Sequence, residues 1–160
     1  MKWFSAQLSV AITLLALAAA GTWYEGSAIR DHSFEWAYST PFSHLIHGEV
    51  LQVSQISSLD HFVYAAKFQP ALPLVMTISA LYAVFLITYR VVKHDLKKWI
   101  TGLVLLMILS LTLGLTLANS PTPGGTAFSY FFIGLGVISS VLTVTGYFLM
   151  SRSPEKEVIQ

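Results

Sequence analysis

Four apolar stretches of about twenty residues each constrain this chain more than any other feature. They cover residues 3–22, 70–89, 99–118 and 128–150. A helix rises 1.5 Å per residue, so each stretch is long enough to cross about 30 Å of hydrocarbon. The 160 residues are 54% hydrophobic and 11% charged, a composition too apolar for a soluble domain. We therefore expect an all-α membrane protein with four transmembrane helices, built as a single integral membrane domain over residues 1–160.

The first stretch has a second interpretation, a cleaved signal peptide. Lys2 precedes an apolar run over Leu8–Ala20, and Ala16–Ala20 offers small residues at a cleavage position. A retained span is favoured because Trp3 and Trp23 lie at its two ends, as in the aromatic belts of membrane helices.

The basic residues predict the orientation of the chain, because Lys and Arg accumulate in cytoplasmic loops. Seven would lie on one side of the membrane: Lys2, Arg90, Lys93, Lys97, Lys98, Arg152 and Lys156. Arg30 and Lys67 would lie on the other. Both termini are therefore expected in the cytoplasm, and residues 23–69, called the cap here, on the extracytoplasmic side.

The cap is the one long segment that is not continuously apolar, and its patterns predict a small sheet. Residues alternate in polarity over Glu35–Ser39, which would put Trp36 and Tyr38 on one face of a strand. Glu49–Val53 alternates as well, with Leu51 and Val53 sharing a face. The fold class expected is thus four spans with a β-containing cap.

The rest of the cap would connect and support these strands. Residues 41–48 would link them as a loop. An amphipathic helix is expected over Ser58–Lys67, with Ser57 or Ser58 as its N-cap and Asp60 favourable in its first turn.

Aromatic side chains of the cap are the first candidate functional feature. Packing and the interfacial belt account for most of them. The sharper interpretation is a partner-binding patch, for which the candidate residues are Trp36, Tyr38 and Phe42. Aromatic residues dominate the energetics of protein interfaces.

Histidines of the cap are the second candidate. His44, His47 and Glu49 could bind zinc or copper, with His32 and His61 in the same segment. Haem held by histidines is also considered, because His44 and His61 could approach the outer surface. The spacing matches no metalloenzyme motif, and loop histidines are commonly solvated. We expect no cofactor and no metal. The chain has no cysteine, which excludes disulfides and thiolate sites.

Polar residues are scarce inside the four stretches. No Asp, Glu, Lys or Arg lies in the middle of a span, which argues against transporters and channels. Small residues four apart, Ser110 with Gly114 and Gly136 with Ser140, predict that the third and fourth spans touch.

Three runs carry a resemblance to a known family. Thr22–Ser27 (TWYEGS), Tyr38–Phe42 (YSTPF) and Asp60–Phe68 (DHFVYAAKF) resemble those of small uncharacterised four-span membrane proteins of Gram-positive, spore-forming bacteria. The resemblance implies this topology and a bacterial plasma membrane, and no activity. The order of span, small sheet, short helix and three spans is also similar to claudin-like proteins, by fold analogy alone.

These observations predict a non-enzymatic accessory or interaction subunit that acts through its cap. The expected partners are the lipid bilayer and another membrane or extracytoplasmic protein, with a homo-oligomer left open. The formal charge of +1 gives no reason to expect nucleic acid. The alternative function is a small membrane enzyme, or a metal or haem carrier, that uses the cap histidines.

Overall fold

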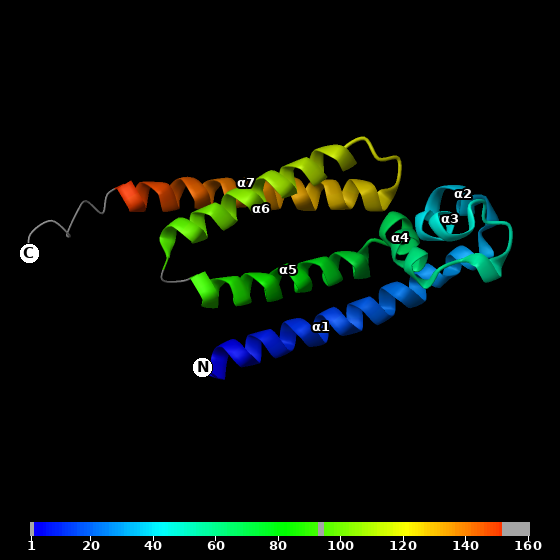
Figure 1. Cartoon of the computed structure of the whole chain (residues 1–160), viewed down its shortest axis with the longest axis horizontal. Coiled ribbons are helices and arrows are strands. Elements are labelled where there is room, and N and C mark those ends of the chain that lie inside the picture. Colours follow the sequence, from blue (N-terminus) through cyan, green and yellow to red (C-terminus); the bar gives the residue numbers. More distant parts are fainter. Residues whose placement is uncertain (1, 93–94, 152–160) are drawn as a thin grey trace, which may run out of the picture. The chain divides into compact units, whose positions relative to one another are not determined.

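The computed structural model describes residues 2–92 and 95–151, which fold into helices joined by short connections (Figure 1). The long helices are α1 (Lys2–Gly26), α5 (Ala71–Val92), α6 (Leu96–Leu117) and α7 (Pro123–Ser151). The cap holds the short ones: η1 (Ser27–Asp31), η2 (Ser33–Glu35), α2 (Trp36–Ser39), α3 (Pro41–His47), η3 (Val53–Gln55) and α4 (Ser58–Phe68). Here η denotes a 3₁₀ helix.

The four expected spans are confirmed as helices long and apolar enough to cross a membrane. They cover Trp3–Asp31, Ala71–Val92, Leu96–Leu117 and Pro123–Leu149. The first is longer than its apolar stretch because α1 runs on into η1 without a break at Trp23. This is the architecture of a multi-pass membrane protein.

The β-containing cap is wrong: the described residues include no strand, and the whole cap lies among them. Glu35–Ser39 forms the end of η2 and all of α2, so Trp36 and Tyr38 do not share a strand face. In the second expected strand, Val50 is buried, whereas Leu51 and Val53 are exposed. The claudin-like analogy, which depended on a small sheet, fails for the same reason.

The segment expected to be a loop between strands is a helix with recognisable ends. Pro41 stands in the first turn of α3, where its missing N–H costs nothing. Gly48 follows the last helical residue with φ of 74°, a backbone conformation that favours glycine. Five alternating residues on either side of this helix were too few to distinguish a strand from a helical turn.

The expected helix after the cap's loop is confirmed as α4. Ser57 is its N-cap, and the hydroxyl accepts a hydrogen bond from Leu59 N at 3.3 Å. Asp60 lies in its first turn and Lys67 in its last, the arrangement that complements a helix dipole.

The chain divides into two compact units. The first holds residues up to Leu86 together with Ser120–Phe128, and the second holds Ile87–Asn119 and the residues from Ser129. In the second unit α6 and α7 contact each other, as their small residues predicted. Ser129 Oγ donates to Gly114 O at 2.8 Å, and both residues are buried.

In the first unit, two glycines allow the main chains of neighbouring helices to approach each other closely. A Cβ added at Gly26 in α1 would lie 1.8 Å from His61 O in α4. A Cβ at Gly124, in the first turn of α7, would lie 1.7 Å from Ala66 O at the other end of α4. Both distances are far inside van der Waals contact, so α4 is held between two glycine contacts.

Candidate functional site

The cap is organised around one buried carboxylate, Asp60 of α4. Its Oδ1 accepts from Phe42 N at 2.9 Å, and its Oδ2 accepts from Ser43 N at 2.9 Å and from the Ser43 hydroxyl. These are the free amides of the first turn of α3, whose own N-cap residue, Thr40, makes no side-chain cap. Asp60 therefore caps α3 from a different helix.

The same network ties in the start of α4. Ser57 N donates to Ser43 Oγ at 2.7 Å, so the Ser43 hydroxyl both accepts from α4's N-cap residue and donates to Asp60. Asp60 and Ser43 are fully buried. A buried carboxylate is costly unless it is hydrogen-bonded, and here two amides and a hydroxyl donate to it.

A second set of polar contacts fastens α2 to the end of α4. The Lys67 ammonium donates to Tyr38 O, and to Ser39 Oγ at 3.2 Å. Ser39 Oγ in turn donates to Glu35 Oε2 at 3.1 Å. The lysine thus meets the carbonyl end of α2, where a positive charge is favourable.

Apolar burial in the cap is modest and centres on Ile29 and Tyr64. Ile29 is fully buried, and its carbonyl accepts from Trp36 Nε1 at 2.8 Å. The Tyr64 ring packs against Phe68 at 4.9 Å between centroids and stacks on His32 at 5.9 Å. Burial, with a smaller contribution from the Glu35 carboxylate, raises the pKa of Tyr64.

The three candidate partner-binding residues do not form one patch. Trp36 is half-buried, and its indole faces Ile29. Tyr38 is 77% exposed, because residues two apart on a helix point about 200° from each other. Phe42 is 39% exposed. Sequence reasoning missed four other strongly exposed apolar side chains of the cap, which are Phe34, Leu45, Ile46 and Leu51.

The candidate metal ligands are separated or occupied. His44 has Nε2 3.2 Å from Trp36 O and Nδ1 beside Gly48 O, so main-chain carbonyls face both ring nitrogens. His47 and Glu49 are exposed. Over residues 2–92 and 95–151, no three His, Cys, Asp or Glu side chains are grouped so that they could hold a metal ion.

Among the histidines of the cap, His61 alone is buried. Its side chain is buried at the α1–α4 contact, 4% exposed, with its ring 5.7 Å from that of Trp23. Thr22 Oγ1, Glu25 Oε2 and His61 Nδ1 are buried there without a hydrogen-bond partner among the described residues. Burial lowers the pKa of His61, and the positive charge of Arg30 lowers it further. A main-chain hydrogen bond at Trp23 and the Asp60 carboxylate oppose this shift.

The depressed pKa of His61 predicts that the cap loses stability in acid. The unfolded imidazole takes up a proton as the pH falls below its ordinary value of about 6.5, whereas the folded one resists. The contribution of His61 to the free energy of unfolding is therefore complete above a pH of about 6.5. It is lost as the pH falls below this value and through the lower pKa of the folded state. We expect the free energy of unfolding to fall between pH 7 and 5 in wild type and less steeply in His61→Gln.

The matched control for this titration is His47→Gln, which removes an exposed histidine from the same segment. Urea unfolding of the detergent-solubilised chain, followed by tryptophan fluorescence, measures the slope. If His47→Gln flattened the pH profile as much as His61→Gln, burial of His61 would not be its cause.

Comparisons with known proteins place this arrangement in a family. Residues 5–92, which contain most of α1, the cap and α5, match DUF4306, described as a domain of unknown function. The uncharacterized protein YjdJ of Bacillus subtilis (strain 168) is 40% identical over 90 residues, which cover 53% of this chain and 83% of that protein. No solved structure matches the chain. The match covers more than half of the sequence, and the chain therefore belongs to the DUF4306 family.

Proposed function

We propose that this protein is a non-catalytic accessory or interaction subunit of the bacterial plasma membrane, acting through its cap. The bias of basic residues supports an orientation with both termini in the cytoplasm and the cap outside. The proposed partner is another membrane or extracytoplasmic protein.

The observation that carries this proposal is a hydrogen-bonded scaffold that displays large apolar side chains. Phe34 is 92% exposed, Leu45 85% and Tyr38 77%. They stand on η2, α2 and α3, which the Asp60 and Lys67 contacts hold in place. Large apolar side chains exposed on a water-facing segment can bury their surface against a partner, and a pre-organised scaffold lowers the entropic cost of binding.

Photocrosslinking in native membranes tests the proposal. A photoreactive residue at Tyr38 or Leu45 should yield one discrete adduct with a protein. The same residue at Ser33, an exposed polar position of η2, should yield far less. An adduct at twice the mass of the chain would identify a second copy as the partner.

Affinity measurements then show whether the crosslinked protein binds the cap specifically or only lies near it in the membrane. The partner identified in the adduct, once purified, should bind wild type and lose about 2 kcal/mol or more of binding free energy to Leu45→Asp, as for an interface hot spot. Ser33→Asp is the matched control and should bind normally. Adducts with lipid alone would contradict the proposal, because the cap would then lie against the outer leaflet.

The alternative function predicts a different result from the same purified protein. A metal or haem carrier would retain zinc, copper or haem in stoichiometric amount, and His44→Ala with His47→Ala would remove it. That outcome would replace the interaction proposal.

A further inference from the structure

The short helix α3 is amphipathic, with its polar side turned into the cap and its apolar side turned out. Phe42, Leu45 and Ile46 recur at i, i+3 and i+4, so they lie on one face of the helix. All three are exposed, Ile46 by 69%. Ser43 is fully buried, and its hydroxyl donates to Asp60. A helix that faces water has the opposite arrangement, so the apolar side, called the α3 face here, is suited to being covered.

The charge close to the α3 face in sequence has one sign. From Asp31 to Ala66 the chain holds four carboxylates and no Lys or Arg. Glu49, which comes two residues after the end of α3, is exposed. The whole cap, residues 23–69, carries two basic and five acidic residues, or 2 − 5 = −3. A surface that complements the α3 face therefore offers apolar side chains bordered by Lys or Arg.

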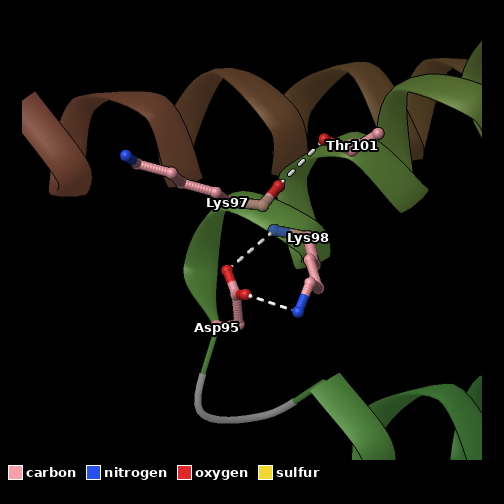
Figure 2. Close-up of polar contacts among 4 residues, drawn as sticks. All are labelled: Asp95, Lys97, Lys98 and Thr101. Carbon is pink, nitrogen blue, oxygen red and sulfur yellow. Dashed lines mark hydrogen bonds and ion pairs between the residues drawn. The ribbon is translucent and has the colours of Figure 1, made fainter.

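A second copy of the chain does not meet this requirement. Two caps would bring formal charges of −3 and −3 together, and like charges across an interface repel. Basic residues cluster instead at the start of α6, where Lys97 is exposed and Lys98 Nζ pairs with Asp95 Oδ2 at 3.1 Å (Figure 2). The predicted orientation puts this turn in the cytoplasm and the cap outside. A neighbouring copy in the same orientation therefore offers the α3 face only Arg30 and Lys67.

The outer leaflet of the membrane is a poorer occupant for a related reason. Helices that lie in a membrane interface carry Lys and Arg on their polar side, which attract anionic headgroups. The α3 helix carries neither residue, and its Ser43 hydroxyl is already bonded to Asp60 inside the cap. A bilayer would cover the apolar side chains and leave the carboxylates of the cap without a countercharge.

We propose that the α3 face docks a protein whose contact surface is apolar at its centre and basic at its rim. This inference rests on the interaction function proposed for the cap and adds the chemistry of the partner to it. Burial of Leu45 and Ile46 supplies most of the affinity. The Glu49 carboxylate orients the partner through a Lys or Arg.

The partner recovered from the photoadduct serves as the probe for this chemistry. Its dissociation constant is measured on the full-length chain in nanodiscs of phosphatidylcholine, a lipid without net charge. Glu49→Gln should raise that constant about threefold, as for an exposed ion pair. Glu49→Lys should raise it about tenfold, because repulsion is added to the lost contact. Added KCl should weaken binding to wild type, since exposed charges are screened.

Two matched controls locate the effect on α3. Asp31→Lys makes the same change of charge in the same segment, ten residues before α3 begins, and should weaken binding less than Glu49→Lys. Ile46→Ala should raise the dissociation constant at least tenfold, as for a central interface residue. Leu59→Ala, which truncates an exposed leucine of α4, should leave it unchanged. The two truncated side chains are more exposed than buried, so both variants should fold.

The outcomes separate this inference from the function on which it rests. A dissociation constant that Glu49→Lys leaves unchanged or lowers would overturn the basic partner, while the cap would remain an interaction surface. Equal weakening by Asp31→Lys would assign the effect to net charge, and an unaltered constant in Ile46→Ala would place docking away from α3. An adduct between two copies would overturn the inference in favour of self-association. Adducts with lipid alone, or no adduct, would remove both the inference and the proposed function.

Discussion

Gly26→Ala is expected to separate α1 from α4 and to destabilise the cap by about 3 kcal/mol, the upper part of the range for overpacking a filled contact. The added Cβ would lie 1.8 Å from His61 O and 2.4 Å from His61 C. Both are main-chain atoms of a helix, so no side-chain rotation can relieve the clash. Gly26 has φ of −68°, which alanine adopts freely, and the cost therefore comes from the contact alone.

The control for this prediction is Gly102→Ala in α6, where nothing lies within 4 Å of an added Cβ. Alanine is the better helix former by about 1 kcal/mol, so this variant should be neutral or slightly stabilised. Urea unfolding followed by tryptophan fluorescence, and protease resistance of the cap in membrane vesicles, measure both variants. A Gly26→Ala protein as stable as Gly102→Ala would mean that α1 and α4 do not approach this closely.

Asp60→Ala is expected to cost about 3–5 kcal/mol, as for removing one partner from a buried charged contact. It would leave Phe42 N, Ser43 N and the Ser43 hydroxyl without their acceptor, and each buried unsatisfied donor costs about 1–3 kcal/mol. The first turn of α3 should fray before the rest of the cap. Hydrogen exchange at the amides of Phe42 and Ser43 should accelerate most.

Asp31→Ala is the matched control, because Asp31 is an exposed carboxylate of the same segment. It removes the same charge and should change the free energy of unfolding by less than about 0.5 kcal/mol, as is usual for surface positions. An equal loss in the two variants would show that net charge, and not the cap on α3, determines the effect. Asp60→Asn keeps one acceptor oxygen and should fall between wild type and Asp60→Ala.

The membrane-spanning helices could be predicted from sequence because their cause is local. Main-chain polar groups in hydrocarbon must be satisfied within the segment, so about twenty apolar residues leave the helix as the available choice. The start of α4 was local too: Ser57 precedes an amphipathic pattern and caps it. The contact of α6 with α7 followed from small residues and a short turn.

The ends of α3 are also present in the sequence, beside the alternation that predicts strands. Pro41 at the first turn and Gly48 after the last residue are ordinary helix signals. Alternation over Glu35–Ser39 has no such boundary chemistry. Boundary residues act through the backbone of their own turn, whereas a five-residue polarity pattern depends on what later packs against it.

Which side chains of the cap are buried was decided only by the tertiary structure. Five carboxylates of the cap are equivalent by composition, and Asp60 alone is fully buried, because the first turn of α3, seventeen residues earlier, faces it in space. Gly26 matters only because His61 of α4 meets it. Burial of a charge depends on donors that no neighbouring residue supplies, so it follows from the meeting of α1, α3 and α4 and not from any local pattern.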